Sequence, residues 1–469
     1  MGLSWGSTQE MSAFETLMWR AEERGMHSPV IALQILDTVP DWGRLVAVHE
    51  WATRMVPRAR QRVVEAPLGL GAPRWSPDPH FELRSHLSRV RLCEGGGFTA
   101  LLEAAARVAM SPFDRTRSPW QAVLYEGLPD GRAGYLLKMH HAGSDGLGVG
   151  QLLAQLHSAR REPRADKPQP PTPAAAQISG LGVLAHQVGR DIASLPGLLA
   201  GAAGAARGVL THPVGAVGTA SRYASSLRRV LSPPAAPGSP LLARRGPNWR
   251  FAALDIPLPG LRAAAKAAGA TLNDAYLGAL LGGYRRYHEA LGAPVAAIPM
   301  AIPLSLRRPG DPGGGNRIAG ARFSGPVHIS DPTARIQTIR ELILSAKREP
   351  AIDTIGLLSP ALARLPGAIS APLAGSQTKG NDLQATLLPG VRREMYLAGA
   401  HIERVYPYAP LPGCAAMVIL VTHGTVGCVG VNFDAAAVTD PELFLRCLSE
   451  GFTEVLSLHP DAAPPRIRT

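Results

Sequence analysis

The sequence predicts a layered α/β or α+β protein whose two halves are joined by an unusual middle segment. Strand-like and helix-like segments alternate in both halves of the 469 residues, which is typical of α/β or α+β layers. Hydrophobic residues make up 46% of the chain, enough for a sizeable buried core. Residues 161–245 are rich in Pro, Ala, Gly and Arg, so we expect segments 1–160, 161–245 and 246–469.

In the first half, residues 29–38 and 132–139 have the composition of strands. The second of these strands ends directly at His140 and His141. Successive strand residues point to opposite faces, so the two histidines are expected to diverge. Apolar residues at helical spacing follow Asp145. The histidines are therefore expected at a strand–loop–helix junction, where side chains are often presented to a cleft.

The middle segment is basic and partly apolar. Residues 168–250 carry a net charge of +7 out of the chain's +12. The uncharged run 192–206 is too short for a membrane span, which needs about 20 apolar residues. Two interpretations stay open: a basic amphipathic hairpin on a membrane surface, or an insertion packed on the body of the protein. A helical stripe in this segment consists of Leu181, Leu184, Val188, Ile192, Leu195 and Leu199.

The second half repeats the alternation of strands and helices. A strand is expected at 250–258, followed by two helices that break at Gly269, with Thr271 as the N-cap of the second helix. Residues 295–307 are strand-like, but their prolines favour an edge or bulged strand. An apolar hairpin is expected to turn near 423–424.

Cysteine usage and charge narrow the class of protein. The four cysteines form neither a CxxC pair nor a zinc spacing, which predicts buried thiols in a reducing compartment. The first 19 residues lack the basic and apolar regions of a secretory signal, so we expect a cytoplasmic protein. A basic chain suits anionic partners. However, the arginines are not interleaved with aromatic residues, so nucleic acid is not expected.

The stretch 138–148, "KMHHAGSDGLG", is the candidate for chemistry. A metal site is disfavoured, because adjacent strand residues can hardly chelate one ion and no HExxH spacing is present. A histidine can accept a proton from a hydroxyl at neutral pH. Asp145 could hold the loop through a charged partner, and Gly146 would permit a tight turn. By spacing alone, a catalytic pair and buried histidines at a strand end both remain open.

Beyond its spacing, HHxxxDG is the signature of the CoA-dependent acyltransferases, which include chloramphenicol acetyltransferase and peptide-synthetase condensation domains. Through nearly its whole length the chain resembles one branch, the bacterial wax ester synthase/diacylglycerol acyltransferases. The matching segments, in order, are "GMHSP" (25–29), 57–92, "SPFDRTRSPWQAVLYEGL" (111–128), "TLNDAYLGAL" (271–280), "IPLSLR" (302–307), "GNRIAG" (315–320) and 393–411.

The resemblance implies a fold and a mechanism. Two chloramphenicol-acetyltransferase-like lobes would surround a central substrate channel and be joined by a long linker. His141 would deprotonate the hydroxyl of a diacylglycerol or long-chain alcohol, and the alkoxide would attack the thioester of an acyl-CoA. No cofactor is implied, since acyl-CoA is a co-substrate. A membrane or lipid-droplet surface on the cytoplasmic side would be the partner.

Supporting roles follow from the same resemblance. His140 is expected to be buried and hydrogen-bonded rather than reactive, and Asp145 to pair with Arg307, although Arg307 could also be a solvated strand end. The pair Asn273 and Asp274 would brace the channel or simply cap a helix. The residues expected to support the channel are Asp114, Arg115, Trp120, Asn273, Asp274, Arg307 and Asn316.

One departure from the family pattern concerns the acceptor. Where the family usually shows SNVPGP, this chain has "ATLLPGV" (385–391), with Leu387 in place of Asn and Val391 in place of the second Pro. The resemblance therefore supports acyl transfer as the reaction more strongly than it supports any one lipid product. A second hypothesis keeps the fold and acylates another hydroxyl, for instance of a polyketide-type lipid. A third is a non-catalytic lipid-surface protein, against which the intact HHxxxDG argues.

Overall fold

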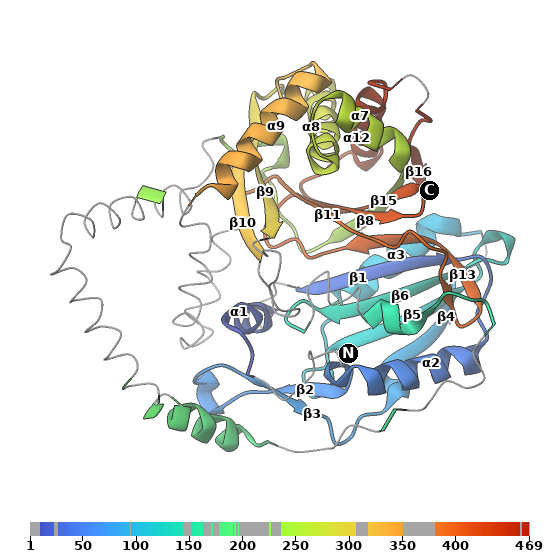
Figure 1. Cartoon of the computed structure of the whole chain (residues 1–469), viewed down its shortest axis with the longest axis vertical. Coiled ribbons are helices and arrows are strands. Elements are labelled where there is room, and N and C mark those ends of the chain that lie inside the picture. Colours follow the sequence, from blue (N-terminus) through green and yellow to red (C-terminus); the bar gives the residue numbers. More distant parts are fainter. Residues whose placement is uncertain are drawn as a thin grey trace.

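The computed structural model shows two lobes stacked on each other, each built on a seven-stranded sheet (Figure 1). The predicted mixture of layered strands and helices is confirmed. The residues described are 10–22, 27–93, 95–143, 152–162, 170–171, 178–190, 192–193, 196, 225–226, 236–305, 318–349, 380–459 and 462–468.

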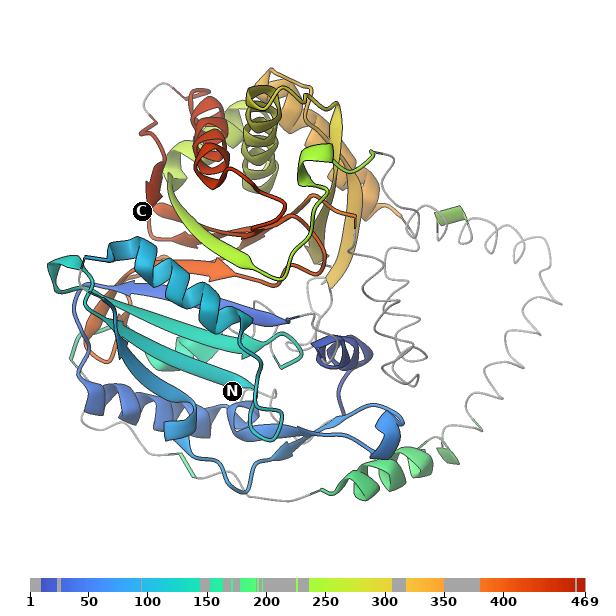
Figure 2. The ribbon, with the colours of Figure 1, turned by 180° about the vertical axis from the view of Figure 1, so that it is seen from behind.

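The first lobe has the strand order β4-β5-β6-β1-β13-β12-β7. Alternate residues of its strands pack on opposite sides, toward α2 on one face and toward α3 and the second lobe on the other. Figure 2 shows α3 at the boundary between the lobes. The strands and helices are α1 (Ala13–Glu22), β1 (Pro29–Leu36), α2 (Trp42–Met55), β2 (Gln61–Val64), β3 (Arg74–Pro77), β4 (Leu87–Arg91), α3 (Gly97–Met110), β5 (Trp120–Glu126), β6 (Ala133–His140), β7 (His157–Ser158), β12 (Tyr396–Leu397) and β13 (Ala400–Tyr408).

The second lobe has the strand order β10-β9-β11-β14-β15-β8-β16. Its helices cover the face of the sheet that points away from the first lobe (Figure 1). Its elements are β8 (Trp249–Pro257), α7 (Leu258–Ala267), α8 (Leu272–Ala290), β9 (Ala297–Ser305), β10 (Ile318–Pro326), α9 (Pro332–Lys347), β11 (Leu383–Leu388), β14 (Ala416–His423), β15 (Val426–Asp434), α12 (Pro441–Leu456) and β16 (Arg466–Arg468).

In the second half of the chain, the predicted helix cap, helix break and hairpin turn are all confirmed. Thr271 caps α8 in a reciprocal capping box, in which Asp274 accepts from the Thr271 backbone N–H. The break before it has Gly269 at a φ of +65°, a conformation that glycine adopts without a steric penalty. The hairpin of β14 and β15 turns at Gly424, which also has a positive φ.

The predicted edge position of the proline-containing strand is wrong. β9 lies between β10 and β11, and it pairs with β10 over nine residues without a register shift. Its pairing with β11 covers only Met300 and Ala301. The Pro299 carbonyl accepts the Asp382 N–H from that side. Proline has no backbone N–H to donate. Prolines are tolerated in β9 because its pairing with β11 is short and needs few N–H donors.

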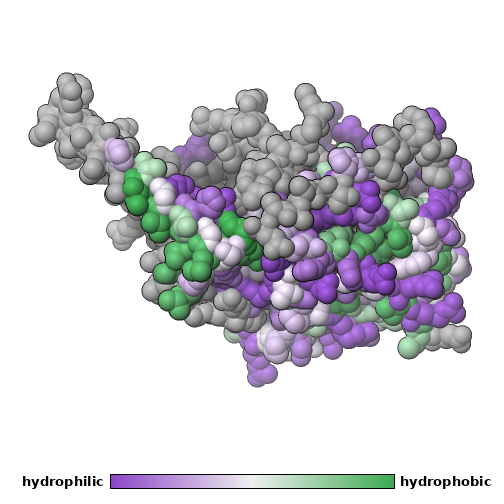
Figure 3. Space-filling view, turned by 90° about the horizontal axis from the view of Figure 1, so that it is seen from below, coloured by the Kyte–Doolittle hydropathy of each residue, from purple (hydrophilic) through white to green (hydrophobic). Residues whose placement is uncertain are grey.

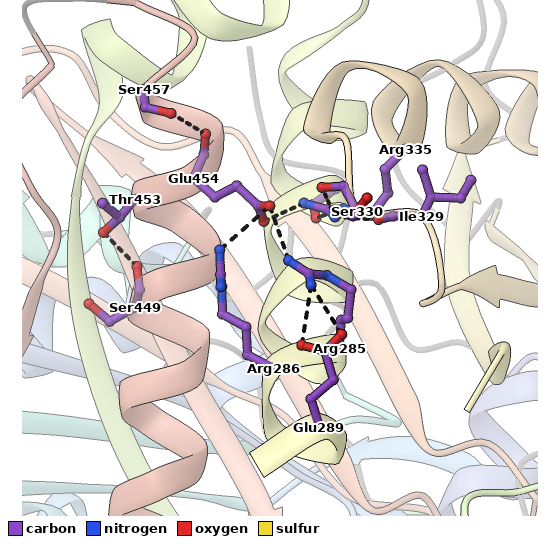
Figure 4. A network of polar contacts seen from close by, with 11 residues as sticks. Arg285, Arg286, Glu289, Ile329, Ser330, Arg335, Ser449, Thr453, Glu454 and Ser457 are labelled. Atoms are coloured by element: carbon purple, nitrogen blue, oxygen red, sulfur yellow. Dashed lines mark hydrogen bonds and ion pairs between the residues drawn. The ribbon is translucent and has the colours of Figure 1, made fainter. Parts of the chain in front are cut away.

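The outer helices of the second lobe are held together by one carboxylate. Glu454 of α12 lies 2.7 Å from the buried Arg335 of α9, and it also pairs with Arg285 and Arg286 of α8 (Figure 4). Arg335 donates further to the Gly278 carbonyl. A buried guanidinium is tolerated where its charge and its N–H groups are both paired. This network therefore fixes three helices on the side of the sheet remote from the first lobe.

The division into one continuous segment per lobe needs a correction. β12 and β13 belong to the 246–469 segment, yet they join the sheet of the first lobe, where β13 pairs with β1. The side chains of Tyr406 and Tyr408 in β13 point into an apolar cluster shared by both lobes, and Phe251 of β8 stacks on Tyr408 at 4.0 Å. A Cβ at Gly430 of β15 would lie 1.9 Å from the Pro407 carbonyl oxygen, so only glycine permits this approach.

The junction of the lobes also contains a buried carboxylate. Asp255 of β8 accepts hydrogen bonds from Tyr406 at 2.6 Å, from Arg404 at 2.9 Å and from Arg468 at 2.9 Å. Burial by itself would raise the pKa of Asp255, but the bonds from Tyr406 and Arg404 outweigh burial and lower it. Asp255 thus connects β8 and β16 of the second lobe to β13 in the first sheet.

We predict that Asp255→Asn lowers the free energy of unfolding by about 3 kcal/mol, because it leaves the half-buried Arg404 and Arg468 without their counter-charge. The folded-state pKa of Asp255 is depressed, so its contribution is complete above the unfolded pKa of about 3.9 and disappears as the pH falls through the folded value. Urea unfolding at several pH values measures both effects. The control is Asp331→Asn at the N-cap of α9, where Asn caps about as well as Asp. Equal losses in the two variants would contradict the prediction.

Candidate active site

The turn after β6 is held from both sides of His141. β6 runs antiparallel to β1, with His140 opposite Pro29. Beyond this pair, the His141 N–H donates to the Ser28 carbonyl at 2.8 Å. The Ala142 N–H donates to the His140 Nδ1 at 3.0 Å, and the Gly143 N–H donates to the His140 carbonyl at 2.9 Å. The backbone that carries His141 is therefore defined by three hydrogen bonds.

The two histidines have different environments. His140 is fully buried between the rings of Trp19 and Phe113, at centroid distances of 4.9 and 5.4 Å, whereas His141 is partly exposed. Burial lowers the pKa of His140, although Glu22 opposes this effect, so His140 is neutral at pH 7. His141 is the partly accessible member of the pair.

Helix α1 lies against this turn. Trp19 and Met11 pack with Ala142 in a small apolar cluster, and Figures 1 and 2 show α1 beside the ends of β1 and β6. Glu22, the last residue of α1, places Oε2 2.6 Å from the His140 Nε2. The contact lies off the line of a straight N–H···O bond. Helix α1 therefore contacts His140 through the ring of Trp19 and through the carboxylate of Glu22.

A second carboxylate fixes α1 in place. Glu65 accepts from the Trp19 Nε1 and from Arg115, each at 2.8 Å, and it lies 3.6 Å from Arg20. Arg20 is almost fully buried and donates to the carbonyls of Gly69 and Gly71. Arg115 also lies 4.1 Å from the centre of the Trp19 ring. The structure thus places Arg115 behind Trp19, one contact away from His140.

Lys138 shares the buried side of β6 with His140. Its Nζ donates to the Ser111 carbonyl at 2.5 Å and lies 4.2 Å from the centre of the Phe113 ring. Burial lowers the pKa of Lys138 to about 8, and the charge of Glu22 opposes this effect. Three ionisable groups, Glu22, Lys138 and His140, therefore lie together beneath the turn. The strand alternation could have revealed Lys138, but no local signal points to Glu22 or Glu65.

Two other residues of the matching motif are not brought to His141. Asp114 is exposed and accepts from the backbone and hydroxyl of Thr116. Trp120 pairs with Met139 across the sheet and is buried toward α2, where it stacks on His86 at 4.7 Å. Its Nε1 donates to a backbone carbonyl in the segment before β2. Asp114 shapes its own turn, and Trp120 is part of the core.

The pair Asn273 and Asp274 lies in the first turn of α8. Asp274 closes the capping box with Thr271 and lies 3.5 Å from Arg340 of α9. α8 belongs to the outer layer of the second lobe, across its sheet from the first lobe (Figure 1). The structure thus places this pair at a helix terminus remote from the histidines.

The remaining predicted site residues lie outside the described part of the chain. They are Asp145, Gly146, Arg307 and Asn316. Pairing of Asp145 with Arg307 stays a prediction, as does the central channel. Within the described residues, no group of three or more His, Cys, Asp or Glu side chains is arranged to hold a metal ion. Of the four free cysteines, three are buried, whereas Cys93 is exposed, contrary to expectation.

Comparison with known proteins identifies the family. Residues 11–276 match the wax ester synthase/diacylglycerol acyltransferase catalytic domain, and residues 314–455 match the C-terminal domain of the same family. A protein of Mycobacterium tuberculosis H37Rv, provisionally named a diacylglycerol O-acyltransferase, is 41% identical over 462 residues, covering 97% of this chain and 94% of the relative. This chain belongs to the wax ester synthase/diacylglycerol acyltransferase family. It is an acyltransferase of that type, for which lipid acceptors and acyl donors are the substrates.

Solved structures support the fold assignment. The wax ester synthase/diacylglycerol acyltransferase from Marinobacter aquaeolei VT8 superimposes with a TM-score of 0.65 at 19% identity, covering 96% of this chain and 100% of that one. The first condensation domain of the CDA synthetase gives a TM-score of 0.58 at 16% identity and covers 99% of this chain and 100% of its own. The condensation-domain-like fold expected from HHxxxDG is therefore confirmed.

We predict that Glu65→Ala lowers the free energy of unfolding by about 3 kcal/mol, because Arg20 is buried and would lose its counter-charge. The matched control is Glu126→Ala. Its partner, Arg91, is exposed and 3.9 Å away, so the loss of this pair should cost less than about 1 kcal/mol. Urea unfolding of both variants measures the difference. A Glu65 variant no less stable than the control would show that the network does not hold α1.

Proposed function

We propose that this acyltransferase moves a long-chain acyl group from acyl-CoA to the hydroxyl of a diacylglycerol or a long-chain alcohol, with His141 as the general base. The observation that carries the proposal is the turn after β6. It offers one partly exposed histidine on a backbone fixed by three hydrogen bonds, beside a second histidine that burial keeps neutral. Membership of the family supports the class of reaction.

The proposed chemistry needs neither a cofactor nor a covalent enzyme intermediate. His141 takes the proton of the acceptor hydroxyl as its oxygen attacks the thioester carbonyl. The new C–O bond forms, the C–S bond breaks, and the proton passes from His141 to the leaving CoA sulfur. General base catalysis of this kind contributes about 10²- to 10⁴-fold. Holding both substrates in one orientation contributes further.

A second candidate acceptor is another lipid hydroxyl, such as that of a polyketide-type lipid. The observation that favours it is the apolar end of β11, where Leu387 stands in place of the family's usual Asn. Leu387 packs on the core of the second lobe, and Leu388 packs on the cluster between the lobes. Glycine is required at position 390 for a structural reason, since a Cβ there would lie 1.8 Å from the Thr422 carbonyl oxygen.

A lipid surface is the proposed partner, because the substrates are too apolar to diffuse freely in water. The surface we assign to it is the apolar platform, which consists of Leu68, Leu70, Leu181, Val188 and Ile192. Leu68 is 89% exposed and Leu181 is 70% exposed. In Figure 3, apolar residues gather at the left of this face. Burying such side chains in lipid is favourable by about 1.5–3 kcal/mol each.

The two parts of the apolar platform are packed against each other. A Cβ at Gly71 would collide with Gln187, and a Cβ at Gly180 would lie 2.8 Å from the Glu65 carbonyl oxygen. Helix 180–190 therefore rests on the turn at 67–70. Leu68 holds a left-handed conformation, which costs a non-glycine residue about 1–2 kcal/mol. The bonds from Arg20 to the Gly69 and Gly71 carbonyls maintain that turn, so the exposed leucine is held outward.

Charge favours a lipid surface as the occupant of the apolar platform. Residues 168–250, which include helix 180–190, carry +7, a charge that attracts anionic headgroups. The platform is purely aliphatic, whereas the centres of protein interfaces are enriched in aromatic residues and Arg. None of the described helices is long and apolar enough to cross a bilayer. We therefore propose peripheral contact with the cytoplasmic membrane face or a lipid droplet.

The proposed reaction predicts acceptor-dependent thiol release from palmitoyl-CoA. Hexadecanol, dipalmitoylglycerol and no acceptor are compared for the parent protein and for His141→Ala, in which release should fall by at least about 10²-fold. His80→Ala, an exposed histidine, is the control and should keep the parent rate. Absence of release from folded parent protein with either acceptor would contradict the proposed substrates. Release that survives His141→Ala would contradict the proposed base.

The apolar platform predicts binding to vesicles of phosphatidylcholine with phosphatidylglycerol. The double variant Leu68→Ser, Leu181→Ser should bind such vesicles at least about 10-fold more weakly, since two leucines no longer insert. Val39→Ser, Val90→Ser replaces two exposed valines outside the platform and should bind like the parent. Equal binding by the two double variants would overturn the assignment. Dissociation of a dimer by the leucine changes, measured by light scattering, would instead show a contact between copies.

A further inference from the structure

We propose that Glu22 is a positioning residue that selects the tautomer of His140 and thereby holds the turn that carries His141. The proposal rests on the proposed role of His141 as the base. Glu22 ends α1, more than 100 residues before the histidines, and its Oε2 lies 2.6 Å from the His140 Nε2. The sequence motifs around His140 do not indicate that Glu22 is its partner.

The tautomer follows from the contacts of the ring. The Ala142 N–H donates to the His140 Nδ1 at 3.0 Å, so Nδ1 must be the unprotonated nitrogen. Burial lowers the pKa of His140, so the ring carries a single proton, which is then on Nε2. The Glu22 carboxylate lies beside that N–H, with Oε2 2.6 Å from Nε2 but off the line of a straight hydrogen bond. A carboxylate beside one ring nitrogen fixes which nitrogen is protonated.

Without Glu22, only the Ala142 N–H among the described groups would favour the proton on Nε2, and the buried Nε2–H would have no acceptor beside it. The alternative tautomer carries the proton on Nδ1, where it would meet the N–H of Ala142. Two donors would then face each other inside the protein, and each would lack an acceptor, which is costly for buried polar groups. The turn between His140 and Gly143 would have to open. His141 lies within this turn, so its orientation would be lost with it.

The surroundings of Glu22 fit a role at this site. Its side chain is 9% exposed, and its Oε1 has no hydrogen-bond partner in the described part of the chain. A purely stabilising carboxylate would be expected to have both oxygens bonded when buried. Lys138 supplies a compensating positive charge from the same face of β6. The walls of this site are the rings of Trp19 and Phe113, which leave the imidazole little freedom to turn.

Two substitutions separate positioning from simple packing. Glu22→Gln keeps an oxygen that can accept the Nε2–H, whereas Glu22→Leu keeps the volume and removes the acceptor. Glu103→Leu, an exposed glutamate on α3, is the control. For a histidine that binds a metal ion, loss of its outer partner typically costs about 10- to 100-fold, and we take this factor as the scale of the effect expected here. We expect kcat for thiol release to fall by this factor in Glu22→Leu with KM nearly unchanged, and Glu22→Gln to restore most of it.

The second readout does not need turnover. Long-range ¹⁵N–¹H correlation spectra of protein labelled with ¹⁵N-histidine report the tautomer of each ring, and His140→Asn identifies the signals of His140. We expect Nε2–H in the parent and in Glu22→Gln, and Nδ1–H or a mixture in Glu22→Leu. An unchanged tautomer and kcat in Glu22→Leu would overturn the proposal, as would a Gln variant as impaired as the Leu variant.

This design also separates two kinds of failure. If the parent protein releases no thiol, the proposed function fails, while the spectra still decide whether Glu22 sets the tautomer. If Glu22→Leu does not fold, as judged by circular dichroism, Glu22→Gln remains as the variant of nearly equal shape. In that case a Gln variant with the parent tautomer and kcat supports the proposal, and one that has lost both overturns it.

Discussion

The strand β13 is the constraint on which the arrangement of the lobes depends. Its backbone pairs with β1 in the first sheet, while Tyr406 and Tyr408 extend into the apolar cluster between the lobes. Gly430 lets the backbone of the opposite sheet approach the Pro407 carbonyl, and Asp255 binds Tyr406 and Arg404 from the other lobe. A strand contributed by the last quarter of the chain thus fixes β1, and β1 in turn fixes β6 and the histidines at its end.

Helix α1 connects the candidate site to the surface. Arg20 holds the turn at 67–70 that presents the exposed leucines, and Glu22, two residues later, reaches His140. Trp19 contributes to both sites, because its ring packs on His140 and its Nε1 donates to Glu65. In the proposed function, the surface that meets the lipid and the turn that holds the base are therefore attached to the same ten-residue helix.

Much of the local structure could be predicted because it depends on neighbours in the chain. The strand at 133–140, the capping box at Thr271 and the hairpin at Gly424 follow from alternation, capping and glycine conformation. Burial of His140 and partial exposure of His141 also agree with the alternation. The position of β9 could not be predicted, since whether prolines are tolerated depends on how many residues the neighbouring strand pairs with. The positions of Trp120 and Asp274 could not be predicted either, because they depend on the layer of the fold in which β5 and α8 lie.

The sequence by itself determined the family and the two histidines, because "HHAGSDG" and the surrounding motifs are properties of residue order. It also determined which elements form, since hydrophobic period and turn residues act over a few positions. Only the tertiary structure decided that β13 belongs to the first sheet and that Glu22 and Glu65 support the histidines. These contacts join residues separated by 40 to several hundred positions. Burial and charge pairing select them, and neither leaves a periodic signal in the chain.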